Sequence, residues 1–189
     1  MLAIPNSEYT RRINRFQENI RAAGLDAALV HANEADFANV RYLSEYWPTF
    51  EAAGVFVPAE GSPVLIIGPE SEAYARTRSK IKQIALMVEY RESAEPEYPG
   101  IPVAHFKDVV KMAMPGKKLR KLGLVGYSVM PLPVYHSLCS ELPKVELIKA
   151  DDTLISLRIN KSANEIKLAK RAYEISEIAV SAILNEIKP

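Results

Sequence analysis

Residues 6–30 read NSEYTRRINRFQENIRAAGLDAALV, and this stretch decides the class of fold. Its apolar side chains recur at steps of four, three and four residues, which is the spacing of one helix face: Tyr9, Ile13, Phe16 and Ile20. Gly24 follows, at the position where a helix end needs a left-handed residue. The apolar run at 26–30 then predicts a short buried strand. A helix, a glycine and a strand in direct succession indicate an α/β protein.

The remaining chain continues this alternation. Further apolar runs predict strands at 53–57, 63–67, 84–88, 122–127 and 145–148, and helices are predicted at 70–80, 106–113 and 134–142. Residues 32–52 show no regular period, and the proline-rich segment 91–103 predicts a loop. The expected fold is therefore a layered α/β domain, in which a mixed sheet of about six strands is flanked by helices.

The last segment predicts one long helix. Ser162 and Glu165 form a capping box, in which a hydroxyl and a carboxylate each accept a free backbone N–H. Apolar residues then recur along the helix: Ile166, Ala169, Tyr173, Val180, Ile183 and Ile187. The helix would run for roughly 22 residues, or about 33 Å. We expect a stripe of this length to pack against a further domain or another subunit, and to drive self-association of the chain.

Charge balance and apolar runs argue against two classes of partner. The chain has 24 Lys and Arg against 23 Asp and Glu, a net charge of +1, and only residues 117–121 form a basic run. A solvated loop or helix start explains that run better than phosphate contacts, so no nucleic-acid partner is expected. No apolar run approaches the roughly 18 residues of a membrane span, and the first residues do not read as a secretory leader. The chain is expected to be cytoplasmic, without a membrane partner.

Few side chains suggest chemistry of their own. Cys139 lies beside Leu138 and is expected to be a core thiol. The histidines do not have the i, i+4 spacing of a helical zinc site: His31, His105 and His136. His31 is expected to be a satisfied structural residue at a strand end, or to lie near a substrate channel. The acids at 151 and 152 could bind a cation, although a turn or helix start explains them more simply.

Three motifs carry a resemblance to a known family. Residues 24–30 (GLDAALV), 39–44 (NVRYLS) and 152–166 (DTLISLRINKSANEI) resemble, in order, its "GLDALLV" strand, its "NxRYL(T/S)GF" motif and its "LRxxKSxxEI" signature. The chain is similar to the N-terminal domain of the creatinase, prolidase and Xaa-Pro aminopeptidase family. Glu45 stands where the family usually has glycine, and Asn160 also departs from the common pattern.

This resemblance implies a creatinase N-terminal-domain (RNase H-like) architecture over residues 1–160. Residues 161–189 would then be the linker and the first helix of a catalytic domain outside this chain. In the family, two metal ions are bound by two Asp, one His and two Glu, all in that catalytic domain. The resemblance therefore implies a chain with no catalytic residue, metal site or cofactor of its own. The parent would be an Xaa-Pro dipeptidase or aminopeptidase with two divalent metal ions (Mn, Co or Zn).

The resemblance also suggests where this domain makes contacts. Family members use it to form dimers, and loops after the "NxRYL" motif reach a neighbouring active site. The corresponding candidates for a substrate-channel wall or an interface are Arg41, Tyr46, Trp47, Phe50 and Glu51. Aromatic side chains with an arginine suit both an interface and a small zwitterionic ligand. The alternative is that Tyr42, Leu43 and Trp47 simply pack into the domain, which leaves Arg41 and Phe50 as the stronger candidates.

Three other functions remain open at this point. A creatinase-type amidinohydrolase would have the same N-terminal domain. A free-standing peptide-binding module would use the fold without any enzymatic partner. An RNase H-like nuclease would need three or four acidic residues that converge at strand ends, and only Asp26 is placed in that way.

Overall fold

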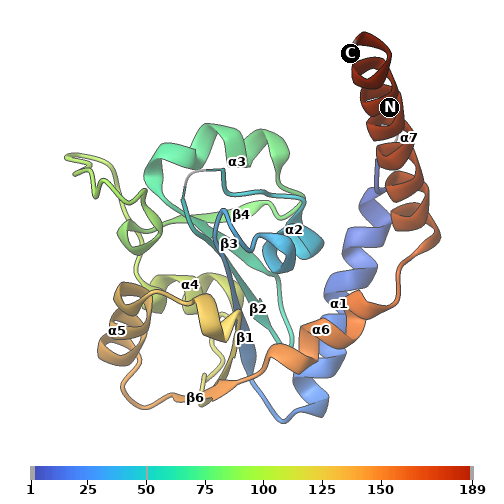
Figure 1. The fold of residues 1–189 in the computed structure, drawn as a ribbon. Coiled ribbons are helices and arrows are strands. Elements are labelled where there is room, and N and C mark those ends of the chain that lie inside the picture. Colours follow the sequence, from blue (N-terminus) through green and yellow to red (C-terminus); the bar gives the residue numbers. More distant parts are fainter. Residues whose placement is uncertain (1–2, 50, 188–189) are drawn as a thin grey trace.

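One mixed sheet of six strands lies at the centre of the computed structural model, which describes residues 3–49 and 51–187 (Figure 1). The strands are β1 (Ala27–Ala32), β2 (Ala53–Pro58), β3 (Val64–Ile67), β4 (Gln83–Leu86), β5 (Lys121–Val125) and β6 (Glu146–Lys149). Their order across the sheet is β4-β3-β2-β1-β5-β6. β2 runs antiparallel to both β1 and β3, and the other neighbouring pairs are parallel. The predicted mixed α/β sheet is confirmed.

Helices cover both faces of the sheet. They are α1 (Asn6–Ala22), α2 (Ala38–Ser44), α3 (Glu72–Arg78), α4 (Phe106–Ala113), α5 (Leu132–Glu141), α6 (Asp151–Ile159) and α7 (Ala163–Glu186), with 3₁₀ turns η1 (Pro69–Ser71), η2 (Val88–Tyr90) and η3 (Tyr127–Val129). Gly24 has a φ of 68°, the left-handed closing conformation that the sequence predicts after α1.

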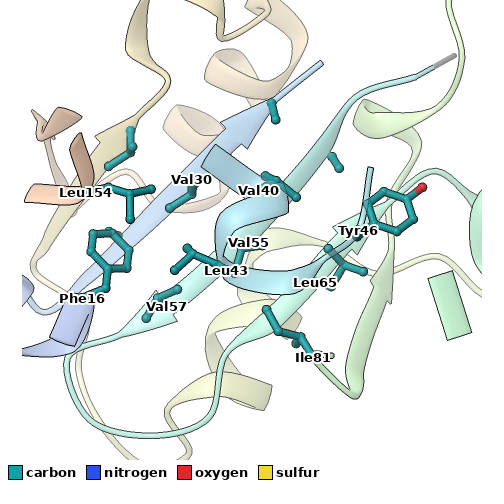
Figure 2. Close-up of a cluster of buried hydrophobic side chains, with 14 of the residues drawn as sticks. Phe16, Val30, Val40, Leu43, Tyr46, Val55, Val57, Leu65, Ile81 and Leu154 are labelled. Atoms are coloured by element: carbon teal, nitrogen blue, oxygen red, sulfur yellow. The ribbon is translucent and has the colours of Figure 1, made fainter. Parts of the chain in front are cut away.

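The buried side chains form two clusters, one on each face. On the first face, Phe16 of α1, Leu43 of α2 and Leu154 of α6 pack on the sheet (Figure 2). On the second face, the apolar sides of α4 and α5 pack on the sheet. β1 contributes alternately to both clusters, with Val30 on the first face and Leu29 on the second. Burial on both faces explains why this strand reads as a continuous apolar run.

Two expectations about particular segments were wrong. Residues 32–52, for which no regular element was predicted, contain α2. This helix has only seven residues, so it is too short to display a clear helical period. Cys139 is an exposed thiol and not a core residue. The core-facing side of α5 carries Val134 and Leu138, and the next residue along the helix points away from it.

α7 is the longest helix among the described residues, and it projects away from the sheet beside the start of α1 (Figure 1). It has 24 residues, so it is about 36 Å long. The predicted capping box is present, because Ser162 accepts from the backbone N–H of Glu165 and the Glu165 carboxylate accepts from that of Ser162. None of its described side chains is buried.

Candidate functional site

α2 and the loop that follows it carry the residues that the sequence marks for contact. α2 is fixed on the sheet by the buried side chains of Val40 and Leu43. Glu45 is the C-cap that follows the last helical residue, and its φ of 62° lies in the left-handed region. That conformation costs a residue with a side chain roughly 1–2 kcal/mol. Ion pairs from the Glu45 carboxylate to Lys80 at 3.0 Å and Arg78 at 3.6 Å offset part of this cost, so glutamate can replace the usual glycine.

Arg41 and Trp47, which are exposed, and the half-buried Phe37 form a group that we call the aromatic shelf. The Phe37 and Trp47 rings stack with their centroids 4.7 Å apart. The Arg41 guanidinium carbon lies 4.9 Å from the Trp47 centroid and 5.7 Å from that of Phe37. Leu43 is buried and Tyr42 packs partly buried against the core, as the alternative interpretation expected, whereas Trp47 is 40% exposed. The shelf presents a cation on an aromatic surface.

Tyr46 and Glu51 point inward. The Tyr46 ring is fully buried, and its hydroxyl donates to Glu51 Oε1 at 2.7 Å. Ser71 Oγ donates to the same carboxylate oxygen, also at 2.7 Å. Burial raises the pKa of Tyr46, and the Glu51 carboxylate adds to this effect. This pair therefore anchors the loop between α2 and β2.

The structure thus separates the sequence candidates into two groups. Arg41 and Trp47 lie together on the surface, while the buried Tyr46 and the half-buried Glu51 form an anchor beneath it. Phe50 lies outside the described residues.

A cavity of about 420 Å³, which we call the junction cavity, opens where α1, α2 and α6 meet the start of α7. It is lined by Ala3, Ile4, Tyr9, Arg12, Phe37, Ala38, Arg41, Tyr42, Glu45, Arg78, Arg158, Lys161, Glu165 and Leu168. Within its wall the Arg12 guanidinium lies over two rings, 4.2 Å from the Tyr42 centroid and 5.1 Å from that of Tyr9. Burial raises the pKa of Tyr9 to about 12, so this phenol stays protonated at neutral pH.

A buried ionic network joins α1 to the start of α7. The Glu8 carboxylate accepts hydrogen bonds from Arg12, Ser162 and Asn164, each at 2.7 Å. Burial alone would raise the pKa of Glu8, but these hydrogen bonds and the Arg12 charge outweigh it and hold the pKa below its ordinary value. The sequence analysis missed this network. The only part of the network that the sequence signals is the i, i+4 spacing of Glu8 and Arg12 on α1. That spacing predicts a pair within one helix, and it does not predict the bonds from Glu8 to α7.

Comparison with known proteins agrees with this architecture. Residues 12–160 match the creatinase/prolidase N-terminal domain. The chain belongs to this family. An Xaa-Pro dipeptidase of Pyrococcus horikoshii is 27% identical over 176 residues, which cover 93% of this chain and 42% of that protein. The chain therefore spans less than half the length of this relative.

Solved structures share the fold of this family member. The Xaa-Pro dipeptidase of Bacillus anthracis gives a TM-score of 0.67 at 22% identity, over 96% of this chain and 44% of that one. The N-terminal domain of the cytoplasmic peptidase PepQ of Mycobacterium tuberculosis gives a TM-score of 0.57 at 23% identity, over 78% of this chain and 98% of that one. No helix within residues 3–49 and 51–187 is both long and apolar enough to cross a membrane.

Two acidic side chains of this creatinase/prolidase N-terminal domain bond to the backbone of neighbouring segments. Among the described residues, no three His, Cys, Asp or Glu side chains are grouped so that they could hold a metal ion. Asp26 accepts from the backbone N–H groups of Arg120 and Lys121, which is a structural role and not that of a nuclease carboxylate. Asp151 begins α6 and accepts from the N–H groups of Gly126 and Tyr127. The carboxylates of Asp26 and Asp151 are therefore both occupied by backbone N–H groups of neighbouring segments.

The histidines of the domain lie apart from one another. His136 is exposed on α5, and His105 is the N-cap of α4. His31 is 1% exposed, and neither ring nitrogen has a hydrogen-bond partner among the described residues, so the expectation of a satisfied histidine was wrong. Its ring instead packs beside that of Tyr90, with 5.7 Å between the centroids, and no described residue pairs with the Tyr90 hydroxyl either. Burial lowers the pKa of His31 to about 4.

Proposed function

We propose that this chain is the non-catalytic N-terminal domain of a two-metal hydrolase, most specifically an Xaa-Pro dipeptidase or aminopeptidase. Two findings support this proposal: the family match over residues 12–160 and the Xaa-Pro dipeptidase relative, of which the chain covers 42%. The parent protein would hold two divalent metal ions (Mn, Co or Zn) in its catalytic domain and cleave small peptides there. The name of that relative favours a peptidase over a creatinase-type enzyme.

The observation that carries the proposal is the uncovered apolar side of α7. At about 100° per residue, its polar side chains gather on one side: Lys167, Lys170, Glu174, Glu177 and Ser181. Large apolar side chains outside this arc are well exposed, including Tyr173 at 77%, Ile183 at 62% and Val180 at 54%. Full burial of each such side chain contributes about 1.5–3 kcal/mol. Covering this side would therefore stabilise a docked catalytic domain by several kcal/mol.

We place the domain boundary between residues 160 and 161. The family match ends at residue 160, and the capping box at Ser162 begins a helix that has no buried residue. Residues 161–189 would then belong to the linker and the first helix of the catalytic domain. The Glu8 network would hold this helix at a fixed angle, because it bonds the side chains of Ser162 and Asn164 to α1.

The aromatic shelf would supply the contact surface of the domain, at a homodimer interface or along the wall of the substrate channel. Arg41 and Trp47 are exposed and stacked, which suits contact with a peptide or a neighbouring subunit. Tyr46 and Glu51 would act as positioning residues, because their hydrogen bond fixes the loop that carries Trp47.

Two adjacent residues of α7 provide a matched test. Val180 is on the apolar side and Ser181 on the polar side, and both are exposed in this chain. In the chain of 189 residues, Val180→Lys and Ser181→Lys are both expected to leave the thermal midpoint nearly unchanged. In the longer parent protein, Val180→Lys should lower the midpoint and the peptidase activity, while Ser181→Lys should lower neither. Equal tolerance of both substitutions in the parent protein would contradict the docking of α7.

A further inference from the structure

The junction cavity carries more positive charge than its carboxylates neutralise. Five cationic side chains line it, namely Arg12, Arg41, Arg78, Arg158 and Lys161, against two carboxylates, Glu45 and Glu165. The lining therefore has a formal charge of +3. Cations crowded around one cavity repel each other, and this repulsion is relieved when an anion enters.

Three of these cations have no carboxylate partner within residues 3–49 and 51–187. Arg12 is neutralised by Glu8 at 2.7 Å and Glu165 at 3.3 Å, and Arg78 lies 3.6 Å from Glu45. Among the residues that the structure describes, the other three make no ion pair: Arg41, Arg158 and Lys161. Arg158 donates to the amide oxygen of Asn39, and Lys161 donates to the carbonyl of Arg158, so both bond to neutral acceptors.

The size and walls of the cavity suit a small ligand. Its volume of about 420 Å³ falls in the range of small-molecule sites, roughly 300–1,000 Å³. Tyr42 and Phe37 supply ring surfaces, and Leu168 of α7 adds an aliphatic one. Guanidinium groups form paired hydrogen bonds with planar carboxylates and with phosphates, which makes these anions their preferred ligands.

We propose that the junction cavity is an anion-binding site, which takes a carboxylate or phosphate group between Arg41, Arg158 and Lys161. An apolar part of the ligand would lie against Tyr42 and Phe37. The anionic group has two possible sources, a free small molecule or an Asp or Glu side chain from the rest of the parent protein. Anion binding here is independent of the peptidase activity proposed above.

Isothermal titration of the chain with inorganic phosphate and with benzoate tests the site. Saturable binding is expected for at least one of them, and it should weaken as salt is added. Arg41→Gln and Lys161→Gln should each weaken binding about fivefold, which corresponds to the loss of one charge-assisted contact. Both side chains are exposed, so these variants should keep the wild-type thermal midpoint. Lys167→Gln is the control, because it removes the same charge from a part of α7 that does not line the cavity.

Absence of saturable binding for both probes would overturn the proposal. Equal weakening by Lys167→Gln would also overturn it, because the effect would then follow net charge and not the cavity. Repeating the titration on the longer parent protein identifies the source of the anion. Binding that persists there indicates a free small anion, and binding that is lost only in the parent indicates that one of its own carboxylates fills the site.

Discussion

Replacement of His31 by leucine tests how a buried, unpaired imidazole makes the stability of this domain depend on pH. His31 lies on β1 with 1% of its surface exposed, and neither nitrogen has a partner among the described residues. Leucine has a similar volume and no titratable group, so the substitution removes the proton-binding site while the packing is largely kept.

The magnitude follows from the shift in pKa. Burial lowers the pKa of His31 from 6.5 to about 4, and exposure on unfolding restores the ordinary value. Between these two values the unfolded chain binds a proton that the folded chain does not, so the free energy of unfolding falls as the pH falls. The full loss from above pH 6.5 to below pH 4 is about 3 kcal/mol, and about 2 kcal/mol of it occurs between roughly pH 7 and pH 5.

Urea unfolding at these two pH values, followed by circular dichroism, measures this loss. Wild type should be about 2 kcal/mol less stable at the lower pH than at the higher one, and His31→Leu should lose almost nothing over the same interval. Any packing change caused by leucine is the same at both pH values, so it cancels in the comparison. His136→Gln, which alters an exposed histidine, should behave like wild type.

An equal pH dependence of wild type and His31→Leu would refute this reasoning. It would mean that His31 reaches water or a hydrogen-bond partner in the folded domain.

Other substitutions test the remaining contacts. Glu8→Gln should lower the free energy of unfolding by about 3 kcal/mol, because it leaves Arg12 buried without its closest charge partner; a loss below about 1 kcal/mol in urea unfolding would contradict this. Gly54→Ala places a new methyl carbon 2.7 Å from the Tyr90 hydroxyl and should cost about 1–3 kcal/mol. Tyr90→Phe removes that hydroxyl, so the cost of Gly54→Ala should shrink in its background, and a double-mutant cycle without coupling would contradict this. Tyr173→Lys should reduce self-association in sedimentation velocity, and a wild-type chain that stays monomeric at high concentration would refute the expectation that α7 drives it.

Much of the fold is predictable because its local signals agree with the tertiary structure. Helix α1 shows a clean period from Tyr9 to Ile20, and Gly24 adopts the left-handed conformation that its position requires. The capping box of α7 depends only on Ser162 and Glu165, which are close in sequence. In contrast, α2 is held by tertiary burial of Val40 and Leu43 and not by its own period, so the sequence does not reveal it.

The candidate site is only partly predictable, because side-chain direction depends on contacts between distant segments. Tyr46 and Trp47 are adjacent, yet Tyr46 is buried and donates to Glu51, while Trp47 stacks on Phe37 at the surface. No local pattern distinguishes them. The junction cavity likewise combines α1, α2 and α6 with the start of α7, and its excess charge appears only when these elements are assembled.

The most direct test of the central claim is a peptidase assay on Xaa-Pro dipeptides with Mn²⁺ or Co²⁺, comparing this chain with the longer parent protein. We predict that the parent protein cleaves these dipeptides and that the chain of 189 residues does not, because its described side chains do not form a two-metal site. Cleavage by the chain alone would contradict the assignment of a non-catalytic domain. A parent protein that binds the metal but cleaves no Xaa-Pro dipeptide would contradict the proposed substrate class.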